Sequence, residues 1–478
     1  MSLLAVAGAN SASGGYEIDN SLKFEQDNSE QIHFTPSSAG NRRTWTFSCW
    51  LKRTELSLEH YIFNFGDEDY NQSGRTLMTF RTGVDQLWFG GGSAYQLKTS
   101  QVFRDTASWY HIVLAVDTTQ ATDSNRLKLY VNGEQITAFD ATSYPSQNFE
   151  YAANRDHKHS IGYNHTDNAS GFSGYMSEVA LIDGQQLTPS SFGETDDDSG
   201  IWKPKNLSTL TFGSNGFYLK FDDSSSLGAD SSGNGNNFTL SNIAAADQAT
   251  DTPTNNFCTM NTNFKTSSSI VVSEGQTKVT CGSGTGWLSN VGTVALTKGK
   301  WYWELASVTS AYQIFGIADA SDDKIPQAAG GYYVGYGSDD TTLSVGMYTV
   351  NGQFYGNQDG GSGVGIAAGA VGDIFGVCLD LDNLGFYIIR NGVSPSGSDP
   401  TSGSSLTGAA TWNDSIYSGY YYPAVSVFQG NGLEMNFGGY TSNPIASAAT
   451  DANGYGSFEY SPPSGYYSIC SQNISLYG

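Results

Sequence analysis

The chain has 478 residues, which exceeds the roughly 250–300 residues at which a single hydrophobic core stops growing, so at least two domains are expected. Only 14% of the residues are charged, and the formal net charge of −24 repels phosphate, which argues against nucleic acid as a partner. No stretch of the sequence approaches the ~20 apolar residues of a membrane-spanning helix, so membrane insertion is not expected.

Residues 1–19 are expected to form an N-terminal arm that anchors the protein in an assembly. The apolar run near the start is short, and no basic residues precede it. A cleaved signal peptide, which normally begins with such a basic region, is the alternative.

Strand signals begin near residue 20 and continue to residue 195. Apolar residues alternate at Trp45, Phe47, Cys49 and Leu51, and the same period of two recurs in 110–116 and 127–131. Two dipeptides predict hairpin turns because their residues tolerate positive φ. They are Asn132-Gly133 and Asp183-Gly184.

From residue 196 to 264 the chain becomes rich in Gly, Ser and Asn, with a strand signal at 217–221. This composition predicts a linker with short strands between two domains. Regular strand patterns return over 265–440, with Asn351-Gly352 and Asn391-Gly392 as further hairpin turns. Residues 441–478, rich in Tyr and Pro, are expected to form an irregular C-terminal extension that coats a domain.

Together these signals predict an all-β protein of two antiparallel β-sandwich domains of the jelly-roll type. The five cysteines are widely spaced and include no C-x-x-C pair, so neither a zinc site nor a disulfide framework is indicated. Cys49 and Cys378 lie within apolar strand patterns and are expected to be buried. Synthesis in a reducing cytoplasm is expected.

Four segments of the first domain resemble, in the same order, the motifs of the laminin-G, concanavalin A-like jelly roll. The resemblance covers residues 20–195. The segments are WTFSCWLK (45–52), WYHIVLAV (109–116), LKLYVNG (127–133) and IGYN (161–164) followed by FSGYMSEVAL (172–181).

The second domain, over 265–440, resembles the SPRY sandwich. The matching segments are GKWYWEL (299–305), GDIFGVCLD (372–380), GFYIIRNG (385–392), YPAVSV (422–427) and LEMNFG (433–438).

Both families are binding scaffolds, and the pair is similar to tail-fibre or appendage proteins of tailed bacteriophages. The resemblance implies a virion protein that contacts other virion proteins and a host cell-surface glycan or protein. It also implies a homo-oligomer, with a trimer as the expected form.

Two groups of residues are candidate metal ligands. His157 and His159 are two positions apart, so on a strand they would share a face and could hold one metal ion. A polar strand edge is the alternative. The second group is rich in side-chain oxygens, which suits Ca²⁺, the one cofactor that the sequence suggests; solvated Asx turns are the alternative. It consists of Asp222, Asp223, Asp230 and Asn234.

Clusters of aromatic residues among glycines are candidate ligand-binding residues, because sugars stack their apolar faces on aromatic rings. Burial in a strand is the alternative, and for Trp88 and its neighbour Phe89 it is the preferred one. The candidates are Trp88, Tyr95, Tyr332, Tyr333, Tyr336, Tyr420 and Tyr421.

No catalytic motif is present: the sequence lacks a nucleophile elbow in a strand–turn–helix context, HExxH, a P-loop and a dinucleotide fingerprint. We therefore expect no enzyme and no catalytic residues. The leading hypothesis is a virion adhesin that binds the host surface. The alternatives are a capsid or tail decoration protein that stabilises the particle, and a polysaccharide depolymerase.

Overall fold

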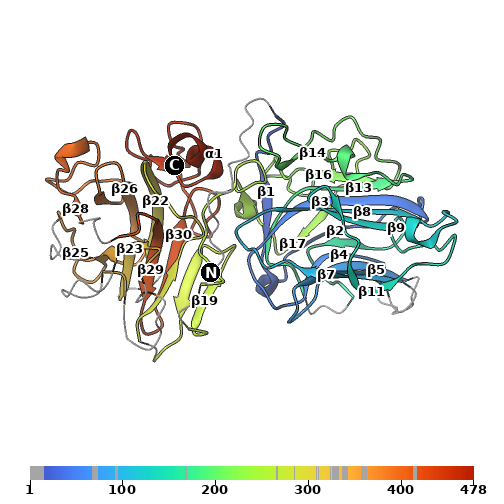
Figure 1. Cartoon of the computed structure of the whole chain (residues 1–478), viewed down its shortest axis with the longest axis horizontal. Coiled ribbons are helices and arrows are strands. Elements are labelled where there is room, and N and C mark those ends of the chain that lie inside the picture. The colour runs from blue at the N-terminus through green and yellow to red at the C-terminus, as the bar shows by residue number, and fades with distance from the viewer. Residues whose placement is uncertain are drawn as a thin grey trace. The chain divides into compact units, whose positions relative to one another are not determined.

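The computed structural model describes residues 15–66, 74–91, 95–166, 170–264, 267–284, 286–307, 309, 312–322, 325, 333–335, 343–356, 363–412 and 417–478. The chain divides into two compact units, residues 12–254 and residues 255–478, which we call the first sandwich and the second sandwich. Both consist almost entirely of antiparallel strands (Figure 1), which confirms the all-β fold class.

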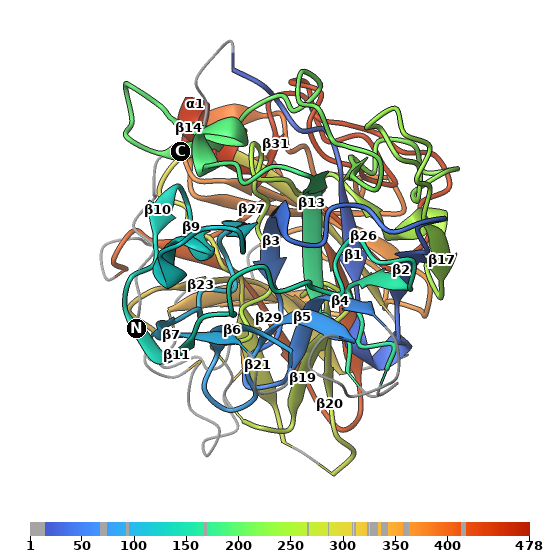
Figure 2. The ribbon, with the colours of Figure 1, turned by 90° about the vertical axis from the view of Figure 1, so that its right-hand side faces the viewer.

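One layer of the first sandwich, the β3 sheet, runs in the order β10-β9-β8-β3-β13-β1-β18, and β16 pairs with β13 beside β1. Figure 2 shows β3 and β13 side by side in this layer. Its strands are β1 (Ser21–Phe24), β3 (Thr44–Arg53), β8 (Tyr110–Asp117), β9 (Leu127–Val131), β10 (Glu134–Gln135), β13 (Gly174–Asp183), β16 (Phe217–Leu219) and β18 (Gln248–Ala249).

The opposite layer, the β4 sheet, runs in the order β11-β7-β6-β5-β4-β12-β2-β17. Its strands are β2 (Gln31–Phe34), β4 (His60–Gly66), β5 (Arg75–Phe80), β6 (Gln86–Gly90), β7 (Gln96–Val102), β11 (Phe139–Ser143), β12 (His159–Ile161) and β17 (Thr239–Ser241). A separate two-stranded ribbon pairs β14 (Gly193–Thr195) with β15 (Trp202–Pro204).

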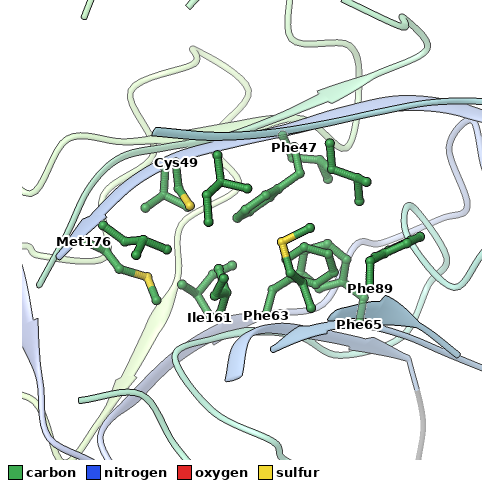
Figure 3. Packing of buried hydrophobic residues seen from close by; sticks show 14 of the residues in the cluster. Phe47, Cys49, Phe63, Phe65, Phe89, Ile161 and Met176 are labelled. Atoms are coloured by element: carbon green, nitrogen blue, oxygen red, sulfur yellow. The ribbon is translucent and has the colours of Figure 1, made fainter. Parts of the chain in front are cut away.

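The core of the first sandwich lies between these two sheets. Phe47 and Cys49 point from the β3 sheet toward Phe63 and Phe65 of the β4 sheet (Figure 3), and the Phe47 and Phe63 ring centroids are 4.6 Å apart. All four side chains are fully buried. The alternation of apolar residues in β3 therefore points one set of side chains into this core, as the sequence predicted.

The segment predicted as a linker belongs largely to the first sandwich, so that prediction is wrong for 196–254. β16, β17 and β18 pair with strands of the two sheets. Buried ion pairs tie the same segment to the β3 sheet: Lys23 Nζ lies 3.0 Å from Asp247 Oδ1, and Lys52 Nζ lies 2.8 Å from Asp251 Oδ2. The segment reads as a linker because its core residues, such as Phe217 and Phe238, are separated by long polar turns.

The second sandwich packs a β22 sheet against a β23 sheet. The β22 sheet runs β19-β20-β30-β22-β26-β27-β28, with β31 parallel to β22, and the β23 sheet runs β21-β29-β23-β24-β25. The bounds are β19 (Ile270–Ser273), β20 (Lys278–Cys281), β21 (Leu288–Val291), β22 (Lys300–Ser307), β23 (Gln313–Asp319), β24 (Ser344–Tyr348), β25 (Gln353–Gly356), β26 (Ile374–Asp380), β27 (Gly385–Arg390), β28 (Ala410–Thr411), β29 (Tyr421–Val427), β30 (Gly432–Asn436) and β31 (Tyr467–Ser468).

The C-terminal residues cover the outer face of the β22 sheet. Phe458 and Tyr466 pack on Tyr302, Cys378 and other outward residues of that sheet. The Glu304 carboxylate on β22 accepts the backbone N–H groups of Glu459 and Tyr460, at 2.8 Å each. The chain ends in a short helix, α1 (Ser471–Tyr477).

Three of the four predicted turns lie where strands turn back. Asn132 and Gly133 have φ values of 50° and 83° between β9 and β10, and Asn391-Gly392 follows β27 in the same conformation. Asn351-Gly352 lies between β24 and β25. The hairpin at Asp183-Gly184 is wrong, because β14 pairs with β15 and not with β13. Within the described residues, no helix is long and apolar enough to cross a membrane.

Candidate functional site

A row of directly paired residues crosses the outward face of the β4 sheet. Paired residues of antiparallel strands share one face, and the neighbours on either side, such as Phe63, Phe65 and Phe89, point into the core. The row therefore points away from the core. In strand order it consists of Ser143, Gln96, Gly90, Leu77, Asn64, Ser160, His33 and Thr239.

Trp88 lies in the next row of the same face, paired with Lys98 and Thr79. Its indole lies over Gly90, because a Cβ atom at Gly90 would be only 2.3 Å from Trp88 Cζ2. The indole Nε1–H donates to Gln96 Oε1 at 3.3 Å. The ring is half-buried, so part of it faces solvent on an otherwise polar sheet surface.

A charged group borders the indole. The Arg81 guanidinium carbon lies 5.4 Å from the centroid of the Trp88 ring, within the range of a cation–π contact. Arg81 Nη1 also forms an ion pair of 2.7 Å with Glu59 Oε1. The Trp88 ring is thus held between Arg81, Gln96 and Gly90, a fixed orientation that suits stacking with a flat apolar surface.

The middle of the row is covered by the segment 162–166. Asn64 Nδ2 donates to Asn164 Oδ1 at 2.6 Å and to Thr166 Oγ1 at 3.2 Å. Below this segment Asn64 Oδ1 and Ser160 Oγ are buried and have no hydrogen-bond partner in the described structure. Each such atom costs about 1–3 kcal/mol of stability. The sheet therefore keeps polar side chains at these positions at a cost in stability.

The imidazoles of this face are neutral. Burial lowers the pKa of His165 to about 4 and also lowers the pKa of His33, and Lys158 lowers both further. A neutral imidazole can donate one hydrogen bond and accept another, and a sugar hydroxyl can do the same. Neither paired row contains Asp or Glu.

The aromatic candidates from the sequence are not brought together. Tyr95 and Tyr421 are buried, so the prediction that they contact a ligand is wrong for this structure. The Tyr95 ring packs on Tyr151 in the core, and Tyr421 accepts a hydrogen bond from Trp412. Tyr333 is half-buried against Trp287, and Tyr420 is 48% exposed. Tyr332 and Tyr336 lie outside the described residues. Of the set, Trp88 is the one on the face described above.

The paired-histidine prediction is wrong, because His157 precedes β12 and the two side chains do not share a strand face. His159 is buried between the Phe65 and Phe34 rings. Its Nε2 accepts from the Asn154 N–H at 3.1 Å, so its Nδ1–H donates to the His157 carbonyl at 2.7 Å. Both ring nitrogens are used, which leaves none for a metal ion.

The residues proposed as Ca²⁺ ligands form turns, which was the alternative interpretation. They are Asp222, Asp223, Asp230 and Asn234. The Asp230 carboxylate accepts from the backbone N–H groups of Tyr218, Ser232 and Asn236, each at 2.9 Å. Asn234 points its amide N–H to backbone carbonyls. Asp223 accepts from Ser225, and Asp222 pairs with Lys220. Among the described residues, no group of three or more His, Cys, Asp or Glu is arranged to hold a metal ion.

One pair resembles a hydrolytic dyad: Ser48 Oγ lies 2.9 Å from His111 Nε2. Trp202 Nε1–H, which can only donate, contacts His111 Nδ1 at 3.0 Å. Nδ1 is therefore the acceptor, and Nε2 carries the proton and donates to Ser48. An imidazole in this state cannot take the proton of the serine, and burial lowers its pKa to about 3.

The polar row itself was missed by sequence reasoning. Its signal is present in β4, where Asn64 lies between Phe63 and Phe65 in a strand of alternating residues. The partners of Asn64 cannot be identified in this way, because Ser160 and His33 are distant in sequence and the pairing register decides which residues meet.

Comparison with known proteins supports the resemblance of the first sandwich. Residues 26–191 match the model of the family described as the concanavalin A-like lectin/glucanases superfamily. This range includes β3 to β12, and therefore Trp88 and most of the row.

Other matches are more distant. E3 ubiquitin-protein ligase RKP of Arabidopsis thaliana is 31% identical over 147 residues, which is 30% of this chain; the match spans 10% of that relative's length. The SPRY domain of human HERC1 is 14% identical, with 37% of this chain and 96% of that chain covered and a TM-score of 0.27. A pentraxin of Limulus polyphemus is 16% identical, with 36% and 80% covered and a TM-score of 0.27.

Proposed function

We propose that this protein is a non-enzymatic adhesin of a bacteriophage particle, and that the outward face of the β4 sheet binds a host-surface glycan. The observation that carries the proposal is the half-buried Trp88 indole, held over Gly90 and beside Gln96 on that face. The family that matches residues 26–191 is described as a superfamily of concanavalin A-like lectins and glucanases, so its members include sugar-binding proteins as well as hydrolases. The virion setting is supported by the pairing of two binding scaffolds in one chain, which is analogy between architectures.

Each group on the face has a role in such binding. The indole would stack on the apolar face of a pyranose ring, and the Gln96 amide would hydrogen-bond a hydroxyl beside it. The row reaches His33 and Thr239 at the other edge of the sheet, but Asn64 and Ser160 in its middle are fully buried, so the accessible surface is the part around Trp88. Several copies on one particle would turn weak single contacts into firm attachment.

The same geometry favours binding over hydrolysis. Glycoside hydrolysis needs two carboxyl groups on either side of the scissile bond, and neither row of the face supplies one. The Ser48–His111 pair has the wrong tautomer for a general base. These observations support the adhesin over the depolymerase; no described contact favours the decoration protein.

Adsorption competition tests the proposal. Host cells are preincubated with purified full-length protein, phage particles are added, and unadsorbed particles are counted. We expect the wild type to block adsorption, Trp88→Ala to lose the block, and Trp88→Phe, which keeps a flat ring, to retain part of it. Val84→Ala, in an exposed turn of the same sandwich, is the control and should act as the wild type.

Two outcomes would overturn the proposal. If the wild type and Trp88→Ala block phage adsorption equally well, the β4 face is not part of the binding site. Folded wild-type protein that neither binds cells nor slows adsorption would contradict the adhesin, and would leave decoration of the particle as the role.

A further inference from the structure

Strands of the β23 sheet carry an aromatic residue at the same end. β21, β29, β23 and β24 are neighbours, and Leu288, Gln313 and Val427 are paired at that end. An aromatic residue stands at or next to the end of each of these strands there: Trp287 before β21, Phe428 after β29, Tyr312 before β23 and Tyr348 as the last residue of β24.

These rings form a continuous strip. The ring centroids are 5.5 Å apart for Tyr312 and Phe428, and 5.2 Å apart for Phe428 and Trp287. The strip continues from Trp287 to Tyr348 at 5.8 Å and from Tyr348 to Tyr355 at 6.0 Å. Tyr333 adds a ring 4.9 Å from Trp287. We call these six residues the aromatic strip.

The strip is partly open to solvent. Tyr312 is 43% exposed, and the other five residues are half-buried. The inner members, such as Tyr333 and Tyr348, pack on a small cluster that includes Ile314 and Val334, which accounts for their buried part. That packing does not require the ring of Tyr312, which lies at the end of the strip.

Tyr312 also has a strained backbone. Its φ is 58°, in the left-handed region that bulky residues rarely adopt. Such a conformation costs about 1–3 kcal/mol and is concentrated at functional sites. Glycine would adopt it without strain, so the tyrosine ring is kept here at a cost in stability.

The described strands that carry the strip contain almost no charged residues. Of the residues in β21, β29, β23, β24 and β25, only Asp319 is charged. Asp319 is buried and bonded to Ser321 and Gly419, at the opposite end of β23. Polar groups beside the rings are neutral amides and phenols: Asn351 Nδ2 donates to the Tyr355 hydroxyl at 2.9 Å. Within the described strands, a protein of net charge −24 therefore places its aromatic strip among neutral residues.

We propose that the aromatic strip is a second binding site, for a neutral oligosaccharide. Neighbouring rings are inclined to one another by angles from 36° to 75°, so a sugar would contact one ring face at a time, and the phenol and amide groups match its hydroxyls. Tyrosine supplies both a ring and a hydroxyl at a low cost in side-chain entropy. The inference rests on the proposed function, since it assigns a second glycan site to the same adhesin.

The test is binding of the full-length protein to an immobilised panel of neutral and acidic oligosaccharides. The variants are Tyr312→Ala and Tyr312→Gly, each compared with the wild type by dissociation constant and by the midpoint of thermal unfolding. Val393→Ala is the control: Val393 is 68% exposed and follows β27, a strand of the β22 sheet.

We expect Tyr312→Ala and Tyr312→Gly to bind neutral oligosaccharides about tenfold more weakly, because the most exposed ring of the strip is lost. Tyr312→Gly should unfold no earlier than the wild type, because it relieves the strained φ. A residue with a purely structural role would instead change stability without changing binding. Val393→Ala should match the wild type.

Trp88→Ala on the same panel separates the two proposals. If Trp88→Ala weakens binding and both Tyr312 variants bind as the wild type does, the aromatic strip is not a glycan site and the proposed function stands. If the Tyr312 variants alone weaken binding, the strip is the glycan site and the β4 face is not. Absence of binding by the wild type to every neutral oligosaccharide would contradict the inference.

Discussion

Gly90 controls the position of the Trp88 indole. The two residues are on the same face of β6, and the ring occupies the space that a side chain at Gly90 would need. Glycine usually weakens a strand. Here Gly90 leaves the space that the Trp88 ring of the proposed stacking surface occupies.

Replacing Gly90 by Ala should therefore displace the ring. The new Cβ would lie 2.3 Å from Trp88 Cζ2, so we expect glycan binding to weaken about tenfold and stability to fall by about 1–3 kcal/mol. Binding and chemical denaturation measure the two effects. Val84→Ala, in an exposed turn of the same sandwich, is the control. Unchanged binding by Gly90→Ala would show that the indole orientation is unimportant.

Glu178 is a buried carboxyl group on β13, at a bulge where its φ is 51°. Burial raises its pKa from 4.5 to about 7, although the Tyr218 and Tyr16 hydroxyls donate to it. The folded state therefore holds a proton that the unfolded state releases between these two values. Its contribution to stability is present below pH 4.5 and is lost as the pH rises through 7.

Glu178→Gln should remove this contribution to the pH dependence. Integrated over the interval, the wild type should lose on the order of 3 kcal/mol relative to the variant between about pH 4.5 and 7. Chemical denaturation of both proteins across that range measures the difference. Four buried histidines act in the opposite direction in both proteins and cancel in the comparison; they are His60, His111, His159 and His165. Parallel pH profiles would contradict the raised pKa.

At the scale of elements, the segment 244–254 is part of the first sandwich because its carboxylates neutralise buried cations. Asp251 accepts from Lys52 at 2.8 Å and from Trp109 Nε1 at 3.0 Å, and both ionic groups are fully or almost fully buried. A charge removed from water in this way depends on its partner.

Asp251→Ala should destabilise the protein by about 3–5 kcal/mol, because it leaves the Lys52 ammonium buried without this partner. The control is Asp222→Ala, which breaks the Lys220–Asp222 pair of the same 2.8 Å length on the surface; it should cost less than about 1 kcal/mol. Both are measured by the free energy of unfolding. Equal, small losses would mean that the segment 244–254 is not held by this pair.

The segment 196–254 shows which strands could not be predicted from the sequence. Period-two alternation identified strands such as β3 and β8, because each is long enough to show its buried face. The strand signal at 217–221 identified β16, whereas β17 and β18 are short and lie in polar sequence, and only pairing with distant strands defines them. For the site, the sequence identified Trp88 but grouped it with Tyr95, since it could not show which aromatic residues face the core.

At the scale of the whole molecule, each sandwich has one surface with aromatic rings available for stacking: the β4 face around Trp88 and the aromatic strip around Tyr312. Two weak sites on one chain, repeated over many copies on a particle, would give strong attachment while each contact stays reversible. Attachment to a neutral glycan through ring stacking and hydrogen bonds should depend little on salt.

The most direct test of the glycan-binding face is equilibrium binding of the purified protein to polysaccharide isolated from the host envelope, with wild type and Trp88→Ala compared in the same buffer. We expect the wild type to bind and Trp88→Ala to bind at least about tenfold more weakly, while keeping the same unfolding midpoint. Equal dissociation constants for the two proteins would contradict the claim that the β4 face of the first sandwich holds the glycan.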